Sequence, residues 1–434
     1  MTPISRRHVL KTCLGTGAWL TTGLWKVHGE NTTAAKVEQA HAEIWRRFID
    51  EYDILIDYAD LDGKYPRPTP EECRDGKPNA LAWWTPTENG SMFNGLYLDA
   101  MCTRWQLSHN EADRTKARRL VNALLKLSSL GTPGFIARNV ATDGSTPYPM
   151  GSNDQTMPWF YGLWRYVQDG LASDDEKSRI IAKMKVVAEV LASTGWLMPC
   201  NEGAPSKFRG GFASIRWEDA PRLIFILKAM HQLTGEEKWA ELYQKLRQEK
   251  DPKTGISRLD VCATGMVFQE KSRHSWTCAG SVACLRALWE METDATLRAI
   301  YAQGLTASVS LAAEGLPLAQ KFDNNTQAAF LQDWRVLNQW WQPQHSEADA
   351  VAVANAEAKE LGPKSPRRYQ EFTWVREPVF AAWIVTLCPD RTVVAPHREA
   401  LEATLAHYDY SKLFYSQFFP AEAAWNRLQL LDRA

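Results

Sequence analysis

The sequence predicts an all-α protein built from paired helices. Past residue 34, apolar side chains recur at helical spacing, and the alternation typical of strands is almost absent. Within each pair the first helix is rich in aromatic and small apolar residues, as in PWFYGLWRYV, whereas the second has a polar face, as in DDEKSRIIAKMKVVAEVL. Because a helix that is apolar all round is buried and an amphipathic one lies at the surface, each pair predicts one inner and one outer helix.

The pairs can be placed along the chain. One helix is expected over 35–59, followed by a proline-rich irregular segment to residue 86. The six expected pairs are 90–107 with 111–130, 156–167 with 173–193, 218–233 with 236–248, 274–291 with 295–313, 327–341 with 347–361, and 377–387 with 397–407. Connections within a pair are tight, whereas those leading into the inner helices are long and polar. Long loops on one face of a rigid scaffold are where binding and catalysis usually occur.

This alternation resembles the six-hairpin (α/α)6 toroid of many glycoside hydrolases and polysaccharide lyases, from about Glu88 to the C-terminus. The resemblance rests on the number of hairpins and on the alternation of apolar and amphipathic helices. It implies a single catalytic toroid domain over residues 31–434. An α-solenoid and a terpenoid-cyclase-like helical array are the alternatives. The chain has no fixed repeat and neither a DDxxD nor a DxDD motif, which disfavours both.

The N-terminus carries a second resemblance. Ser5-Arg6-Arg7 followed by His8-Val9-Leu10-Lys11 resembles a twin-arginine export signal. The apolar run over 13–25 is too short and too rich in glycine and threonine for a good transmembrane helix. The resemblance implies a signal peptide over residues 1–30 and a mature chain beginning between Gly29 and Ala35. The mature protein would be periplasmic or extracellular, with no stable membrane span.

Composition narrows the possible partners. Lys plus Arg (50) nearly equals Asp plus Glu (51), so the basic footprint of a nucleic-acid-binding protein is absent. The 19 tryptophans suit an aromatic core or a groove that stacks sugar rings. Seven cysteines remain after residue 30, with no CxxC spacing, which argues against a disulfide framework and a zinc site. No metal or nucleotide motif is present, so no cofactor is expected.

Candidate catalytic residues lie where the inner helices begin. Such residues often cap helices, but capping explains neither the Trp83-Trp84 pair nor the Arg273-His274 pair. Hydrolysis of a glycosidic bond generally needs one protonated carboxyl and one carboxylate. Glu88 and Asp154 are the first choice, because they precede successive inner helices and both have aromatic neighbours. The reserve pair is Glu218 with Asp219, although nearby arginines offer these two a purely structural role.

Elimination by a lyase is the alternative chemistry on the same scaffold. It needs a base beside a group that neutralises the substrate carboxylate, and His274 next to Arg273 fits this need, with Asn89 and Tyr148 in neighbouring loops. A helical sugar-binding protein without catalysis is the third possibility. An isolated histidine is usually structural, so hydrolysis of an oligosaccharide, preferably one that contains uronate, is the leading hypothesis.

The remaining candidates are substrate contacts. Aromatic rings could stack on sugars, although Trp159 could equally belong to the core, and arginines could grip a substrate carboxylate through two parallel hydrogen bonds. The stacking candidates are Trp83, Trp84, Trp159, Trp217, Trp276 and Trp374; the arginines are Arg138, Arg209 and Arg273; and the other polar candidates are Asn89, Tyr148, Asn153, Gln155 and Glu218.

Overall fold

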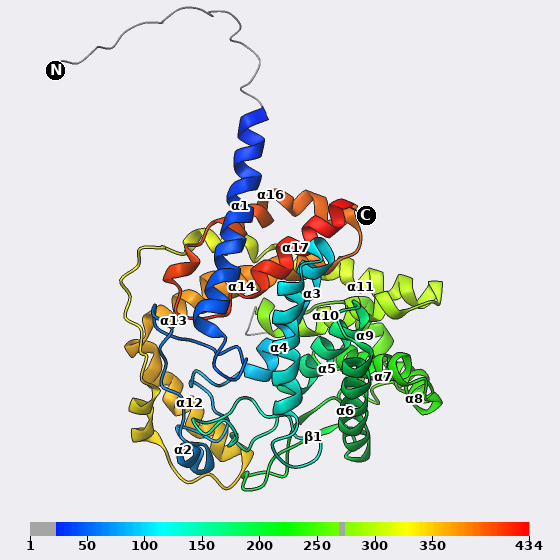
Figure 1. Ribbon diagram of the computed structural model, residues 1–434. Coiled ribbons are helices and arrows are strands. Elements are labelled where there is room, and N and C mark those ends of the chain that lie inside the picture. The colour runs from blue at the N-terminus through cyan, green and yellow to red at the C-terminus, as the bar shows by residue number, and fades with distance from the viewer. Residues whose placement is uncertain (1–22, 269–273, 434) are drawn as a thin grey trace, which may run out of the picture.

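The computed structural model describes residues 23–268 and 274–433 (Figure 1). It confirms the all-α class, because most of the described chain is helical. The strands β1 (Leu197–Pro199) and β2 (Phe208–Gly211) form a small antiparallel ribbon in which Leu197 pairs with Gly211 and Pro199 with Phe208. One hydrophobic cluster contains buried residues from Val37 to Leu428, so both ends of the described chain contribute to the same core.

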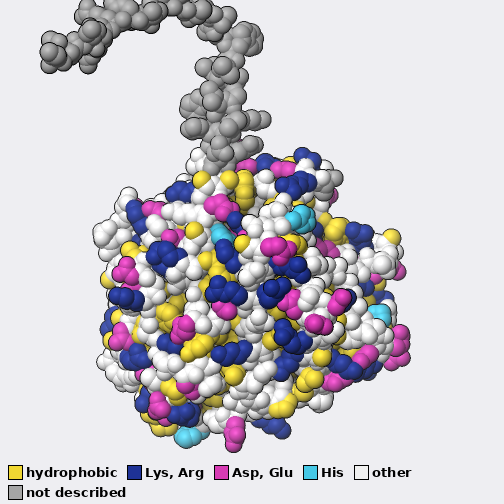
Figure 2. All heavy atoms as spheres, in the orientation of Figure 1, with side chains coloured by type: hydrophobic (Ala, Val, Ile, Leu, Met, Phe, Trp, Pro, Cys, Tyr) yellow, Lys and Arg dark blue, Asp and Glu magenta, His cyan; other side chains and the backbone are white. Residues whose placement is uncertain are grey.

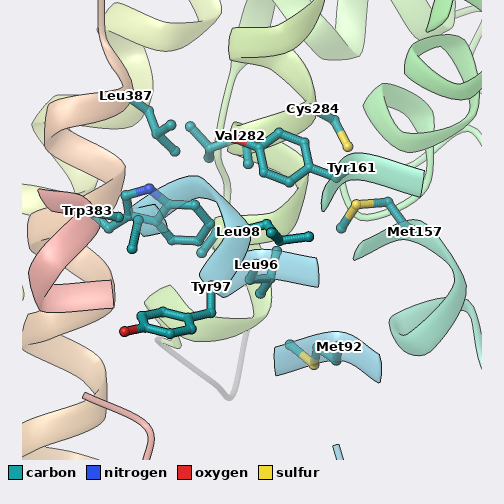
Figure 3. Packing of buried hydrophobic residues seen from close by; sticks show 14 of the residues in the cluster. Met92, Leu96, Tyr97, Leu98, Met157, Tyr161, Val282, Cys284, Trp383 and Leu387 are labelled. Carbon is teal, nitrogen blue, oxygen red and sulfur yellow. The ribbon is translucent and has the colours of Figure 1, made fainter. Parts of the chain in front are cut away.

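Six largely buried helices contact one another in a closed cycle. In the order of their contacts, α3 packs on α5, α5 on α7, α7 on α10, α10 on α14, α14 on α17, and α17 returns to α3. Their bounds are α3 (Gly90–Ser108), α5 (Asn153–Gln168), α7 (Ala220–Thr234), α10 (Ser275–Met291), α14 (Glu377–Leu387) and α17 (Pro420–Arg433). Figure 3 shows this packing, with Leu96 and Leu98 of α3 between Trp383 of α14 and Met157 of α5.

A second set of helices packs outside this cycle. It comprises α1 (Gly23–Glu43), α4 (Glu111–Leu127), α6 (Asp174–Ser193), α8 (Glu237–Gln248), α11 (Ala295–Ala313) and α16 (Arg398–Ala406). Each contacts one or two helices of the cycle, for example α4 on α3 and α11 on α10 and α14. Polar side chains cap several outer helices, as where Asn110 accepts a hydrogen bond from the amide of Ala112 at the start of α4.

The helices α3 and α5 meet at glycines. A Cβ on Gly95 of α3 would lie 2.1 Å from the carbonyl oxygen of Pro158, and one on Gly162 of α5 would lie 2.6 Å from the carbonyl oxygen of Gly95. Both distances are far below van der Waals contact, so the absence of a side chain lets the two backbones approach. This contact places the beginnings of α3 and α5 next to each other.

Two expectations about the helices are wrong. The segment 327–341 forms no inner helix: residues 327–333 have no regular secondary structure, and residues Trp334–Trp340 form the 3₁₀ helix η3. Its side chains bind the proline-rich segment instead, since the Trp334 Nε1–H donates to the carbonyl of Pro66 at 2.8 Å. Its expected partner forms α12 (Glu347–Lys364), which packs on η3. The sixth inner helix is α17 and its outer neighbour is α1.

The helix expected over 35–59 ends early. After α1 the backbone continues as a π-helical turn, η1 (Ile44–Phe48), and then leaves helical geometry. The carboxylate of Asp50 accepts hydrogen bonds from the amides of Tyr52 and Ile54 at 2.8 and 2.9 Å, and Asp53 has a φ of 63°. This local turn competes successfully with the helix. It brings the following residues against the start of α3.

The shorter helices complete the described fold. They are α2 (Pro70–Asp75), α9 (Arg258–Thr264), η2 (Leu316–Lys321), α13 (Pro366–Glu371), η4 (Phe372–Arg376), α15 (Arg391–Val394), η5 (Ala395–His397) and η6 (Tyr410–Lys412). Among the described helices, none is long and apolar enough to span a bilayer. Figure 2 shows positive and negative side chains interspersed over the visible face. All seven cysteines of the described chain are buried and unpaired.

Candidate functional site

A cavity of about 380 Å³ lies where the N-terminal ends of several inner helices meet. This volume is in the range of small-molecule sites and suits one or two sugar rings. Aromatic, arginine and carboxylate side chains dominate its wall. The lining residues are Trp83, Trp84, Glu88, Asn89, Met92, Arg138, Asp154, Arg209, His274, Trp276, Thr277, Arg368, Phe372, Arg376 and Gln417.

The cavity brings together many of the residues singled out from the sequence, although they come from distant parts of the chain. Those that line it are Trp83, Trp84, Glu88, Asn89, Arg138, Asp154, Arg209, His274 and Trp276. Both members of the first-choice carboxyl pair are among them. Convergent polar groups in one concavity are the usual geometry of a binding or active site.

Other candidates lie away from the cavity wall. Trp159 is fully buried and donates to the carbonyl of Leu124 at 2.9 Å, which makes it part of the core. The Tyr148 side chain is also buried, and its hydroxyl donates to the carbonyl of Lys77. Trp217 is buried as well.

The remaining candidates support the cavity or lie outside it. Gln155 accepts a hydrogen bond from the amide of Met92 at 3.0 Å and donates to Asn89 at 3.3 Å, so it braces the start of α3. Asn153 donates to Asp219, and the carboxylate of Glu218 lies 3.7 Å from Arg216 Nε. Trp374 is half-buried beside Tyr369. Arg273 lies outside the described residues.

Glu88 is half-buried directly before α3. Its Oε2 accepts a hydrogen bond from the amide of Trp84 at 2.9 Å, and its backbone carbonyl accepts one from Arg138 Nη1 at 3.0 Å. Burial raises the pKa of the Glu88 carboxyl, while the Trp84 amide and the charges of Arg138 and Arg368 oppose that rise. A raised pKa suits a carboxyl that must carry a proton near neutral pH.

Asp57 lies behind this carboxyl and was not recognised from the sequence. Its two carboxylate oxygens accept hydrogen bonds from the amide and the side chain of Asn89, at 2.8 and 2.7 Å. Burial and the charge of Glu88 raise the pKa of Asp57 well above its ordinary value. Asp57 therefore anchors Asn89 and, through it, the residue that precedes it. No helical or strand pattern marks this aspartate in the sequence.

Asp154 occupies a different environment at the start of α5. Its side chain is 54% exposed, and its Oδ1 lies 3.1 Å from Nη1 of the buried Arg222. The hydroxyl of Ser152 accepts a hydrogen bond from the Asp154 amide at 3.2 Å and so caps the helix in its place. A recess of about 30 Å³ beside Asp154 also contacts Arg222 and Thr277. That volume is what one water molecule occupies in the liquid.

His274 is the residue directly before α10. Its Nδ1 lies 3.4 Å from Oε1 of Glu377, and the amide of Trp276 donates to Oε2 of Glu377 at 3.4 Å. Glu377, the first residue of α14, therefore satisfies an orphan amide of α10. The Nη2 of Arg376 lies 3.0 Å from the same carboxylate, so this arginine balances the negative charge of Glu377.

Two arginines missed in the sequence share one aromatic ring. The guanidinium carbons of Arg368 and Arg376 lie 4.5 and 4.2 Å from the ring centre of Phe372. The former is also 4.3 Å from the ring of Trp84, and the latter 4.5 Å from that of Trp276. The spacing of four residues between arginine, phenylalanine and arginine, just before Glu377, is the signal that could have revealed them.

The described part of the chain contains no cluster of three or more histidine, cysteine, aspartate or glutamate residues able to hold a metal ion. No protein-family model matches the chain, and neither does any curated protein or solved structure.

Proposed function

We propose that this protein hydrolyses a glycosidic bond of an oligosaccharide in the cavity lined by Glu88 and Asp154. The supporting observation is that two carboxyl groups line one cavity in contrasting environments. Glu88 is half-buried, with a pKa raised by burial, whereas Asp154 is exposed and paired with Arg222. Two carboxyls in contrasting surroundings can divide the acid and base roles of glycoside hydrolysis.

In this mechanism Glu88 is the general acid. Its protonated carboxyl donates to the glycosidic oxygen as the bond to the anomeric carbon breaks. Asp154, whose Oδ1 lies 3.1 Å from Nη1 of Arg222, provides the negative charge that the positive anomeric centre needs, and it can also accept a proton from an attacking water. The recess beside Asp154 has room for such a water.

Aromatic side chains provide the surface for the sugar rings. Trp83, Trp84 and Trp276 line the cavity and are only half-buried. Trp84 is firmly held, because its amide donates to Glu88, its Nε1–H donates to the carbonyl of Ala354 at 2.8 Å, and its own carbonyl accepts from the Tyr58 hydroxyl at 3.0 Å. Rigid indoles lose little entropy when a flat ligand stacks on them.

The fold we propose for this site is the (α/α)6 toroid. The closed cycle of contacts among α3, α5, α7, α10, α14 and α17, with six helices packed outside it, supports this arrangement. The cavity at the N-terminal ends of these helices is where such a toroid would hold its substrate.

Elimination is the weaker alternative. His274 lines the cavity, but it faces the carboxylate of Glu377, and the second expected participant, Tyr148, is buried with its hydroxyl bound to a backbone carbonyl. A lyase would therefore have to work without that tyrosine. Hydrolysis uses two carboxyls that both line the cavity.

Export by the twin-arginine route is part of the proposal. The residues of the motif lie outside the described part of the chain. Cleavage between Gly29 and Ala35 would fall within α1 and would retain Val37 and Ala40, both buried in the core. The helix would keep its contacts with α16 and α17 through such residues.

The test is to incubate the purified protein with neutral and uronate-containing oligosaccharides while following reducing ends and ultraviolet absorbance together. Hydrolysis predicts new reducing ends at constant absorbance. Falling absorbance on pre-cleaved uronates would identify an unsaturated-uronyl hydrolase, and rising absorbance a lyase. Glu88→Gln and Asp154→Asn should each lower the rate at least about 100-fold, whereas Glu241→Gln, on the exposed face of α8, should not. Silence across the panel would favour a binding protein.

A further inference from the structure

We propose that Arg368 binds a carboxylate group of the substrate, so that the cavity selects an acidic sugar over its neutral counterpart. This inference rests on the proposed function in taking the cavity as a sugar site, but it concerns binding and does not depend on which bond is broken.

Arg368 is held in place by rings and by no acid. Its guanidinium carbon lies over the rings of both Trp84 and Phe372, 4.3 and 4.5 Å from their centres. Within the described residues it has no hydrogen bond or ion pair to a side chain. Stacking on two rings uses the faces of the guanidinium and leaves its N–H edge, which is the part that forms paired bonds to a carboxylate.

The other arginines of the cavity have partners in the protein. Arg376 pairs with Glu377, Arg138 Nη1 donates to the Glu88 carbonyl, and Arg209 Nε lies 3.4 Å from Glu347. Arg209 was a candidate for the substrate carboxylate, and its ion pair makes it less available than Arg368. Among the described residues, four arginines thus line the cavity against two carboxylates, Glu88 and Asp154, and Asp154 is already paired with Arg222.

Helix ends add to this positive potential. Asn89 and His274 occupy the N-cap positions of α3 and α10, and neither side chain forms a capping hydrogen bond. The helix dipoles at these two starts favour an anion.

The opposite end of the inner helices differs. A second cavity of about 430 Å³ lies there, but each of its arginines is paired: Arg165 with Asp169, Arg286 with Glu290 and Arg427 with Asp99. Cationic excess is therefore a feature of the first cavity and not of inner-helix ends in general.

The experiment measures binding of monosaccharides, which contain no glycosidic bond to cleave. Dissociation constants of the full chain for glucuronate, glucose and glucose 6-sulfate, and for the three corresponding galactose compounds, would be obtained by NMR titration. At least one uronate should bind more tightly than its neutral partner. Arg368→Gln should weaken that binding about 10- to 100-fold and so remove most of the preference for the uronate over its neutral partner. Arg391→Gln, whose side chain is 65% exposed on α15, should have no effect.

Arg368→Lys serves as a second variant if Arg368→Gln fails to fold. It keeps the charge but not the planar fork, and it should weaken uronate binding about five- to tenfold. Equal binding of acid and neutral sugars, preference for the sulfate esters, absence of uronate binding, or full binding by both Arg368 variants would overturn the inference. Cleavage of neutral oligosaccharides without uronate binding would overturn it while sustaining the proposed hydrolysis. Uronate binding that depends on Arg368, without cleavage of any oligosaccharide, would sustain this inference and overturn the proposed hydrolysis.

Discussion

Asn89 donates two hydrogen bonds to Asp57, with its backbone amide 2.8 Å from one carboxylate oxygen and its side-chain nitrogen 2.7 Å from the other. Both residues are buried, and Asn89 is the residue next to Glu88. The paired contact ties the start of α3 to the irregular segment after α1. It therefore links the position of the proposed acid to a part of the chain that has no regular secondary structure.

Asp57→Asn should destabilise the protein. An amide at this position offers one acceptor and presents donors where two acceptors are needed, so one buried N–H of Asn89 loses its partner. We expect the free energy of unfolding to fall by about 1–3 kcal/mol, measured by urea denaturation, together with a loss of hydrolytic rate. The exposed Asp62→Asn is the matched control. If both variants unfold at the same urea concentration, Asp57 has no anchoring role.

The pH dependence of hydrolysis should report Glu88. A general acid acts when protonated, so kcat/KM should fall as pH rises through the pKa of Glu88, which burial raises above its ordinary value of 4.5. The positive charge of Arg368 lowers this pKa. Arg368→Gln should therefore move the basic limb of the profile to higher pH, by about half to one pH unit. A limb that stays in place, or moves to lower pH, would argue against Glu88 as the acid.

Glu357 should make stability depend on pH. It is fully buried on α12, receives a hydrogen bond from Asn79 at 2.7 Å, and has a pKa raised to about 8 by burial. Because its folded-state pKa exceeds its unfolded value, its contribution is fully present below about pH 4.5 and is lost as pH rises to about 8.

Glu357→Gln removes this titration while keeping the shape. The thermal midpoint of the variant should rise relative to the parent between pH 5 and pH 8, by roughly 5 °C. Glu360→Gln, on the same helix but only partly buried, should show no such trend. A constant difference between Glu357→Gln and the parent across this range would contradict the buried proton.

Gly95→Ala should separate α3 from α5. The new Cβ would lie 2.1 Å from the Pro158 carbonyl oxygen, a contact that only backbone movement can relieve. We expect a loss of about 1–3 kcal/mol in the free energy of unfolding. Gly362→Ala is the control, because that glycine of α12 has nothing within 4 Å, and alanine there should be neutral or slightly stabilising. Equal effects of the two changes would mean that the close approach is not needed.

Local pattern predicted much of the helical content. The all-round apolar sequence of α14 and the polar face of α4 identified an inner and an outer helix correctly, because burial imposes these patterns on each helix separately. The same rule misjudged residues 327–341, where Trp334 and Trp341 donate hydrogen bonds to backbone carbonyls of the proline-rich segment. It also left α17 outside every pair, although this helix closes the contacts between α14 and α3.

The candidate site was also predicted only in part from the sequence. The residue types at the inner helix starts already brought Glu88, Asp154, His274, Trp84 and Trp276 to attention, because a helix start facing one end of a bundle must expose its polar groups there.

Tertiary structure alone decided which of these groups share a cavity, and it added Asp57, Arg368 and Phe372. It also placed Trp159 in the core and tied Arg209 to Glu347. The physical reason is that helix formation depends on neighbours three and four residues away, whereas the charge and proton affinity of a site depend on groups that only folding brings within a few ångströms.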